Sequence, residues 1–355
     1  MNPLDSINRI KECDRSGMLE IIESFPEQCL DAKRIGDEFE LPEGFKTKYK
    51  NIACIGMGGS AIGADLVRSY IADKAEVPLF VIRSYALPDF VDDGTLVIAS
   101  SYSGNTEETL SAYDEAVKRG CGIIAITSGG KLLELAKDDN AGIINIPAGL
   151  PPRAALGYSA FSILILLSKT GIIKDQSFFI DDAIRNLRKL KKLNFGHKIK
   201  SKDNQAKKIA KQIYGKMPVV YAACDRVDAV VTRWHGQLAE NSKTLSLRNV
   251  FPEMTHNEIE GWENPPAILE NSVVIMLEDA ADDRRVLKRM AVVKKILKKS
   301  GIDVIEIRST GNELLGRIFS LVYMADFVSF YLAMLNRIDP SPVARIAYLK
   351  RELSK

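Results

Sequence analysis

Short apolar runs alternate with helical periodicity through most of the chain, and this alternation limits the possible folds more than any other feature. Runs that are apolar throughout and are separated by helices are typical of parallel sheets covered on both faces. The pattern appears once before residue 150 and starts again near residue 217. We therefore predict an α/β protein with two successive subdomains, each a parallel sheet flanked by helices. The predicted strands are 51–57, 77–82, 96–100, 122–126, 143–146, 218–223, 244–248, 273–277 and 304–307.

The length of 355 residues fits two domains of ordinary size. We place an N-terminal subdomain with a helical extension at residues 1–173, a basic helical linker at 174–206 and a C-terminal subdomain at 207–355. Between Lys191 and Lys202 the linker is rich in lysine, but Phe195 is its only aromatic residue there. Without aromatic side chains for base stacking, we interpret this charge as a solvated helix and linker. The formal net charge of +3 gives no support to a nucleic-acid or anionic-membrane partner.

The cysteines are scattered and never spaced Cys-x-x-Cys. They are Cys13, Cys29, Cys54, Cys121 and Cys224. This pattern argues against a disulfide framework and a cysteine zinc site, and it favours a reducing, cytoplasmic location. Residues 1–15 mix charged and apolar side chains, so we expect no signal peptide there. We regard residues 160–167 as the most apolar stretch, which is far too short to span a bilayer and predicts a buried helix.

The segment from Gly56 to Ser60 follows the first predicted strand and opens a helix. Glycines let the backbone approach an anion, and a helix N-terminus presents N–H groups and partial positive charge. Gly58, Gly59 and Ser60 are the expected contacts. A Walker phosphate loop is excluded because no Gly-Lys-Ser/Thr follows. A simple tight turn and a dinucleotide site both remain alternatives, although the glycine spacing fits the dinucleotide fingerprint badly.

A second loop, from Ser101 to Thr109, follows the third predicted strand and again opens a helix. Ser101, Ser103 and Thr106 place three hydroxyl groups around one helix start. Hydroxyl groups without lysine or arginine suit a terminal phosphate monoester and do not require magnesium. The alternative is an ordinary capped helix without a ligand. Together, the two loops predict a phosphate-binding site.

These loops resemble the sugar isomerase fold, which is used by sugar-phosphate isomerases, aminotransferases and regulators. Four further motifs extend the resemblance over nearly the whole chain, in the same order. They are Pro152-Arg153, the segment 239–243 (AENSK), the segment 256–262 (HNEIEGW) and the segment 339–343 (DPSPV). The combination resembles the bifunctional phosphoglucose/phosphomannose isomerases. That resemblance implies two sugar-isomerase subdomains, a homodimer, no metal and no cofactor.

The resemblance also implies a reaction and residues for it. Glucose 6-phosphate and mannose 6-phosphate would each be interconverted with fructose 6-phosphate through an enediolate. Glu240 would be the base that moves the proton between C2 and C1. Arg153 would supply fixed positive charge for the enediolate oxygens, and Pro152 would contact the substrate beside it. Ser341 would form part of the wall that accepts either epimer.

Ring opening needs a proton shuttle, for which histidine is suited near neutral pH. His197 lies in the basic linker, where we expect it to be solvated, and we interpret His235 as structural. His256 sits in a polar loop and matches the position implied by the resemblance, with Lys350 as the second ring-opening group. The same resemblance implies that His256 serves the neighbouring subunit.

Three other functions are alternatives for this sequence. A sugar-phosphate-binding regulator of this fold would keep the serine loop but would not need Glu240, Arg153, His256 and Lys350 together. A glucosamine synthase would require a glutaminase domain with an N-terminal cysteine nucleophile, whereas this sequence begins Met-Asn-Pro. A zinc-dependent phosphomannose isomerase is disfavoured because the three histidines are dispersed.

Overall fold

The computed structural model describes residues 3–43, 45, 48–224 and 226–353. The chain forms two compact units. Unit A comprises residues 24–186 and 311–318, and unit B comprises residues 1–23, 187–310 and 319–355. The division differs from the predicted boundaries at residues 173 and 206, because the segment predicted as a linker is shared between the units and the first 23 residues group with unit B.

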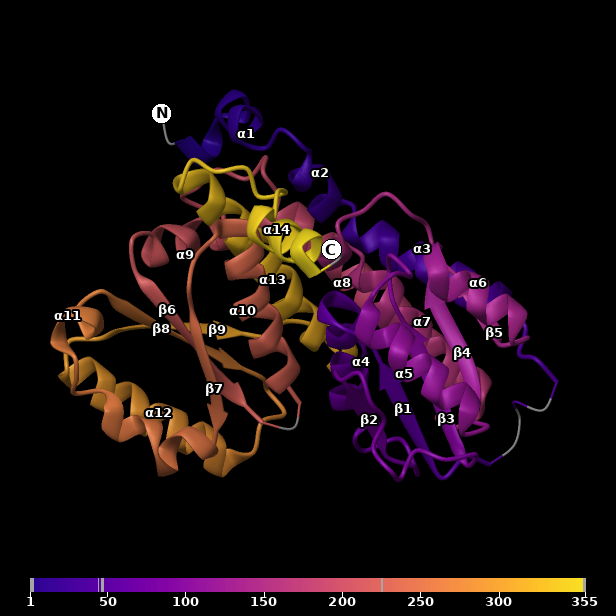
Figure 1. Cartoon of the computed structure of the whole chain (residues 1–355). Coiled ribbons are helices and arrows are strands. Elements are labelled where there is room, and N and C mark those ends of the chain that lie inside the picture. The colour runs from indigo at the N-terminus through magenta and orange to yellow at the C-terminus, as the bar shows by residue number, and fades with distance from the viewer. Residues whose placement is uncertain (1–2, 44, 46–47, 225, 354–355) are drawn as a thin grey trace. The chain divides into compact units, whose positions relative to one another are not determined.

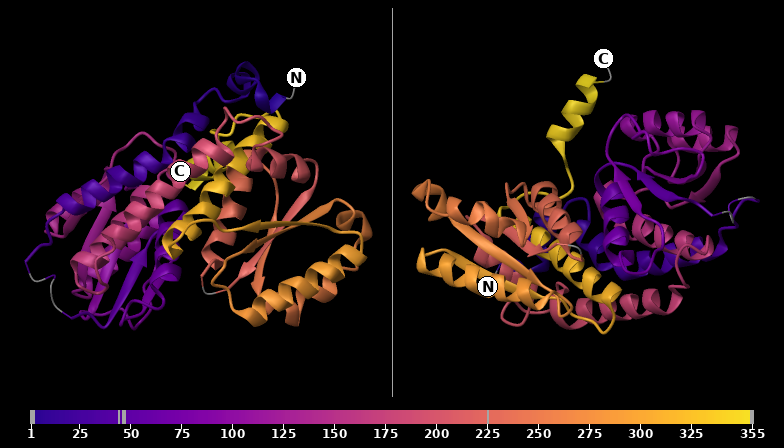
Figure 2. Two further views of the ribbon diagram at one scale, coloured as in Figure 1. Left: turned by 180° about the vertical axis from the view of Figure 1, so that it is seen from behind. Right: turned by 90° about the horizontal axis from the view of Figure 1, so that it is seen from below.

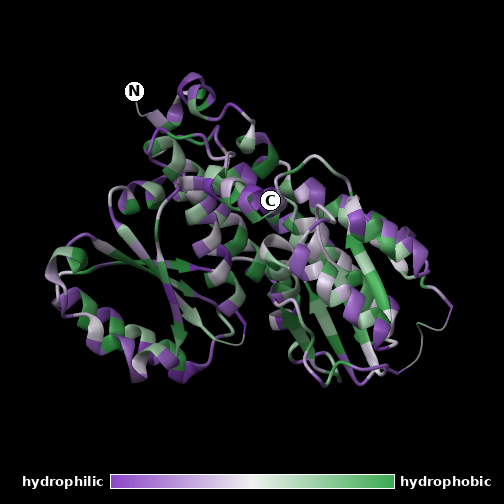
Figure 3. Cartoon of the chain, in the orientation of Figure 1, coloured by the Kyte–Doolittle hydropathy of each residue, from purple (hydrophilic) through white to green (hydrophobic). Residues whose placement is uncertain are grey.

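Unit A is built on a parallel five-stranded sheet with strand order β2-β1-β3-β4-β5. The sheet is drawn in Figure 1, and Figure 3 shows that its strands are mostly hydrophobic. The central strands β1 and β3 are buried along their whole length. All five strands lie where the apolar runs predicted them, because a strand buried on both faces leaves a continuous signal in the sequence. The strands are β1 (Asn51–Ile55), β2 (Leu79–Ile82), β3 (Thr95–Ser100), β4 (Gly122–Thr127) and β5 (Gly142–Asn145).

Helices cover both faces of this sheet. Helices α5 and α6 pack on one face, where Tyr113 and Leu132 contact the core formed with Val97. Helix α4 packs on β1 and against α7, which in turn packs against α3. Helix α6 is short and starts at Gly130. The helices are α3 (Phe25–Glu38), α4 (Gly58–Ile71), α5 (Glu107–Lys118), α6 (Gly130–Asp138), η2 (Pro152–Ala154), α7 (Leu156–Lys169) and α8 (Ser177–Leu190).

Unit B repeats the architecture with a parallel four-stranded sheet of order β7-β6-β8-β9. The strands are β6 (Met217–Ala223), β7 (Leu247–Phe251), β8 (Ser272–Glu278) and β9 (Asp303–Arg308). The prediction of a strand at 244–248 was wrong by three residues. The preceding helix continues to Ser242, and the N–H of Thr244 still donates to the carbonyl of Leu238 at 3.0 Å, so extended backbone begins later.

Helix α12 covers one face of this second sheet, with Met290, Val293 and Leu297 in a core shared with Val274 and Met276. Helix α10 packs on β6 and β7. Helix α14 stands away from the sheet of its own unit (Figure 2). The helices are η1 (Pro3–Asp5), α1 (Ile7–Cys13), α2 (Met18–Glu23), η3 (Lys191–Phe195), α9 (Gln205–Ile213), α10 (Asp228–Ser242), η4 (Glu253–His256), η5 (Glu258–Gly261), α11 (Pro266–Leu269), α12 (Arg284–Lys299), α13 (Leu314–Leu335) and α14 (Ala344–Leu353).

Helix α13 is the longest helix described, while residues 160–167 form part of the buried helix α7, as predicted. The 22 residues of α13 reach a mean hydropathy of 1.8 over the most apolar window. Length and composition alone would allow such a helix to cross a membrane. However, 94% of that window is buried inside the protein, which is the arrangement expected of a core helix.

Part of the basic segment is structured by ion pairs rather than solvated. His197 Nδ1 lies 2.7 Å from Glu23 Oε1, so the expectation of a solvated His197 was wrong. The side chain of Lys207 is fully buried and donates to Asp5 at 3.1 Å. Burial lowers the pKa of Lys207. These contacts tie the first 23 residues to the segment around residue 200 and explain why both belong to unit B.

Candidate active site

The strand order of unit A creates a place where a ligand can bind. Strand β1 has β2 on one side and β3 on the other, so the chain leaves β1 and β3 in opposite directions. In open α/β sheets, ligands bind beyond the carboxyl ends of the strands at such a switch point. The glycine turn after β1 and the hydroxyl loop after β3 both lie there, and each leads into a helix of at least 12 residues.

The glycine turn requires glycine for two separate reasons. Gly58 has φ +50°, a left-handed conformation that glycine adopts at little cost. Gly56 lies so close to the end of β3 that an added Cβ would be 2.7 Å from the carbonyl oxygen of Ser100. The two loops therefore touch at the switch point. Ser60, in the first turn of α4, is 8% exposed.

In the hydroxyl loop, the predicted residues take different positions. Ser101 is buried, and its hydroxyl donates to Thr106 Oγ1 at 3.0 Å. Ser103 is exposed and accepts a hydrogen bond from the N–H of Asn105 at 3.3 Å. Thr106 is the N-cap of α5, yet its side chain makes no capping bond within the described part of the chain. The ordinary capped helix is therefore not formed through Thr106, and the first N–H groups of α5 are not occupied by that hydroxyl.

The structure brings Pro152 and Arg153 to the start of α4. A Cβ on Gly59 would lie 2.7 Å from the carbonyl oxygen of Pro152, which leaves no room for a larger residue. The Arg153 side chain is only 4% exposed. A guanidinium that is always charged and nearly excluded from water interacts strongly with an anionic group that reaches it.

Gln28, which the sequence analysis did not single out, braces this turn from α3. Its Nε2 donates to the carbonyl of Ala154 at 2.8 Å, and its Oε1 accepts from the N–H of Gly157 at 2.7 Å. Both bonds hold the backbone that follows Arg153. A glutamine inside an amphipathic helix leaves no sequence signal for this role, since its partners lie about 130 residues away.

The corresponding switch point of unit B is suited to different chemistry. Strand β8 is followed by Asp279 and Asp282, both buried. The Ser309 hydroxyl donates to Asp279 at 2.6 Å, and burial raises the pKa of Asp282 to about 6. Carboxylates at this position would repel a phosphate, so the anion-binding features belong to unit A.

Glu240 lies in the last turn of α10 and is half-buried. The face of α10 toward α13 is fixed by polar contacts, because Arg233 and Gln237 both donate to Asp326, at 2.8 and 2.6 Å. Asn241 donates to Ser329 at 3.0 Å. Such a buried polar stripe sets the rotation of the helix, and with it the direction of Glu240.

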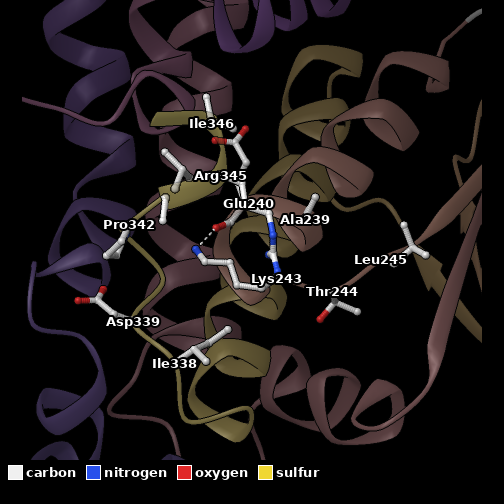
Figure 4. A pocket seen from close by; sticks show the side chains of 12 residues that line it. Ala239, Glu240, Lys243, Thr244, Leu245, Ile338, Asp339, Pro342, Arg345 and Ile346 are labelled. Carbon is white, nitrogen blue, oxygen red and sulfur yellow. Dashed lines mark hydrogen bonds between the residues drawn. The ribbon is translucent and has the colours of Figure 1, made fainter. Parts of the chain in front are cut away.

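A pocket of about 830 Å³ opens beside Glu240 (Figure 4). It lies within unit B, between the end of α10 and the segment that leads into α14. The lining residues are Ala239, Glu240, Lys243, Thr244, Leu245, Ile338, Asp339, Pro342, Val343, Ala344, Arg345 and Ile346. The structure thus brings the predicted base and the Asp339–Pro342 segment to one pocket.

Three other residues of unit B's predicted set are not among the lining residues: Ser341, Lys350 and His256. Ser341 lies between the lining residues Asp339 and Pro342, and its N–H donates to Asp339 Oδ1 at 2.9 Å. Lys350 is exposed on α14, beyond Ile346, the last residue of the lining. His256 is exposed at the end of η4, in a loop whose Glu258 accepts hydrogen bonds from Tyr221 and Asn249.

His235 has the surroundings of a structural residue, as predicted, since its Nδ1 lies 2.9 Å from the Ser246 hydroxyl. Burial lowers its pKa. Within the residues that the structure describes, no three or more histidine, cysteine, aspartate or glutamate side chains gather in a way that could hold a metal ion.

Comparison with known proteins places the chain among sugar-phosphate enzymes. Residues 47–148 match the family model of the SIS domain, and residues 202–353 match that of the bacterial phospho-glucose isomerase C-terminal SIS domain. A bifunctional phosphoglucose/phosphomannose isomerase of Caldicellulosiruptor bescii is 43% identical over 95% of this chain and 99% of its own length. A protein of the same name from Aquifex aeolicus is 40% identical over 87% of this chain and 92% of its own.

Solved structures agree on the fold. The crystal structure of a hypothetical protein from Thermus thermophilus superposes with a TM-score of 0.72 at 15% sequence identity, covering 96% of this chain and 91% of that one. The prediction of two parallel sheets flanked by helices in the sugar isomerase arrangement is confirmed.

Proposed function

This chain belongs to the family of bifunctional phosphoglucose/phosphomannose isomerases, and from that premise we propose that it interconverts glucose 6-phosphate and mannose 6-phosphate with fructose 6-phosphate. The reaction moves one proton between C1 and C2 of the open-chain sugar. The observation that carries the proposal is the pair of helix starts at the switch point of unit A, set within a chain whose relatives match it over nearly its full length.

Phosphate binding is assigned to unit A. The N-terminal turns of α4 and α5 supply backbone N–H groups and partial positive charge. Ser103 is exposed at this point, and Ser60, Ser101 and Thr106 complete the hydroxyl set with Gly58 and Gly59 in the turn. Because these contacts are made to the ester oxygens in ground state and transition state alike, they mainly set KM.

Proton transfer is assigned to Glu240. A carboxylate suits a carbon acid because it takes the proton from one carbon and returns it to the next. The negative charge that develops on O1 and O2 needs a fixed positive partner, for which we propose Arg153, with Pro152 contacting the substrate beside it. Preorganised charge of this kind usually contributes more to the rate than any other single effect.

Ring opening is assigned to His256 and Lys350, which would move a proton between the ring oxygen and the C1 hydroxyl. We propose a homodimer in which His256 serves the neighbouring subunit. Mixing Glu240→Gln and His256→Ala proteins should then restore activity through heterodimers. A complete lack of recovery, after verified subunit exchange, would mean that both groups act within one chain.

The five free cysteines among the described residues agree with the proposed cytoplasmic location.

Use of both epimers follows from the intermediate. Loss of the C2 proton makes C2 planar, so the enediolate retains no memory of whether it came from glucose or mannose 6-phosphate. One base then serves both, provided that the chain can rotate about C2–C3 and that the wall accepts the displaced hydroxyl. We propose Ser341 for that contact, since it lies between Asp339 and Pro342, which line the pocket beside Glu240.

The test is to measure both aldoses with one preparation in the presence of a chelator. We expect kcat/KM values within about 10³-fold of each other, and activity that survives the chelator. A larger gap, equivalent to more than ~4 kcal/mol of discrimination, would mean that the pocket rejects one epimer. The alternative of a non-catalytic regulator is not favoured, because the relatives that carry isomerase names span nearly the entire chain.

A further inference from the structure

Helix α10 ends on a residue whose conformation is unusual for its type. Lys243, the C-cap residue, has φ +52° and ψ +34°, in the left-handed region. Helices often end in this conformation, but the residue there is usually glycine because a Cβ makes it unfavourable. A lysine in this place needs a reason beyond the turn itself. Its side chain provides one.

The ammonium group of Lys243 joins two separate pieces of backbone. It donates to the carbonyl of Glu240, in the last turn of α10, and to the carbonyl of Pro340 at 3.1 Å. Figure 4 shows the first of these bonds. The last carbonyls of a helix have no partner within the helix and carry partial negative charge, so a cation is stabilised there. Asn336 supports the same helix end by donating to the carbonyl of Ser242 at 3.0 Å.

The two pieces are those that carry the proposed base and the proposed epimer contact. Glu240 lies one helical turn before Lys243, and Pro340 directly precedes Ser341. Both pieces line the pocket of about 830 Å³. The geometry points to Lys243 as a positioning residue for the isomerase reaction: its ammonium holds the Asp339–Pro342 segment at a fixed place relative to the turn of α10 that carries Glu240. This inference rests on the proposed function.

A positioning role has a recognisable kinetic signature. The phosphate contacts belong to unit A, so loss of the Lys243 bonds should leave KM nearly unchanged. Turnover should fall because a misplacement of about 1 Å at the reacting atoms costs on the order of 10²-fold in rate. The two epimers should be affected unequally, because the proposed base Glu240 and the proposed contact of Ser341 to the displaced hydroxyl lie on the two pieces that Lys243 joins.

The test uses three substitutions of Lys243 and a matched control. Lys243→Gly removes the ammonium group without straining the turn, because glycine adopts the left-handed conformation at little cost. This variant therefore tests the side chain independently of the backbone conformation. Lys243→Met keeps an unbranched side chain without the donor, and Lys243→Arg keeps a cation. The control is Asn140→Gly, at the end of α6, where an exposed residue has φ +54°.

We expect kcat to fall by about 10-fold or more in Lys243→Gly and Lys243→Met, with KM within about twofold of wild type. The ratio of mannose 6-phosphate to glucose 6-phosphate turnover should change in both variants. In Lys243→Arg, kcat should recover partially. Amide hydrogen exchange in the peptide covering residues 338–344 should become several-fold faster in the first two variants only. Asn140→Gly should match wild type in every measurement.

Two results would overturn the inference. Wild-type kcat and epimer ratio in Lys243→Gly would mean that only the backbone turn matters. Unchanged hydrogen exchange in residues 338–344 would mean that the ammonium does not hold that segment, and this result counts whether or not the enzyme is active. An inactive wild-type protein with faster exchange in the variants would instead reject the proposed function and keep the structural link.

Discussion

Replacing Gly59 by alanine tests how tightly the start of α4 fixes the turn that carries Arg153. The new Cβ would lie 2.7 Å from the carbonyl oxygen of Pro152 and 3.4 Å from the Cα of Arg153. An ordinary contact begins near 3.4 Å, so the Pro152 carbonyl must move by about 0.7 Å. Both neighbours are backbone atoms, which cannot rotate away as the end of a flexible side chain can.

The effects on stability and on activity should differ in size. Alanine in a helix is favoured over glycine by up to ~1 kcal/mol, while overpacking costs roughly 1–3 kcal/mol. The free energy of unfolding should therefore fall by only about 0–2 kcal/mol. The effect on activity should be larger, because a shift of nearly 1 Å displaces a group that stabilises the transition state. We expect kcat/KM to fall by roughly 10- to 100-fold.

The assay is kcat/KM for glucose 6-phosphate beside the free energy of unfolding in denaturant. Gly236→Ala is the matched control, because it lies inside α10 and its Cβ would meet no heavy atom within 4 Å among the described residues. That variant should be stabilised by up to ~1 kcal/mol with wild-type activity. A folded Gly59→Ala enzyme with unchanged kcat/KM would refute the idea that this close approach places Arg153.

Two further substitutions test the phosphate loop and the buried carboxyl of unit B. Ser103→Ala removes a hydrogen bond to a charged group worth ~1.5–3 kcal/mol, so KM should rise by roughly 10- to 100-fold with a smaller change in kcat; an unchanged KM would remove Ser103 from the phosphate site. Burial raises the pKa of Asp282 from 3.8 to about 6. Between these two pH values the folded protein keeps a proton that the unfolded chain has lost, so the contribution of Asp282 to stability falls as pH rises from 3.8 to about 6. Asp282→Asn should be about as stable as wild type near pH 4 and more stable at pH 7.5, by up to about 3 kcal/mol, in denaturant unfolding; an equal difference at both pH values would contradict the assigned pKa.

The strands and most helices were predictable because burial on both faces imposes a local pattern. Residues 107–118 and 284–299 are amphipathic segments that end at charged residues, and they form α5 and α12 in the structure. The bounds of β7 were not predictable in the same way. It is an edge strand with an exposed start, and its position depends on where α10 ends.

Long-range contacts account for what the sequence could not reveal. Gln28 acts on a turn about 130 residues away, and His197 is paired with Glu23, which lies 174 residues earlier in the chain. The candidate residues of the glycine turn and the hydroxyl loop were found because both follow buried strands that turn out to be neighbours. Lys243 was part of a motif in the sequence, but its left-handed backbone and its bond to Pro340 are visible only in the fold.

The central claim is that a single carboxylate, Glu240, moves the proton between C1 and C2. The most direct test is the exchange of deuterium from heavy water into the sugar phosphate, measured for wild type and for Glu240→Gln at equal binding of substrate. Glutamine keeps the shape of the side chain but cannot accept the proton, so exchange and kcat should both fall by roughly 10²- to 10⁴-fold. Exchange in Glu240→Gln at the wild-type rate would contradict the account and show that another group is the base.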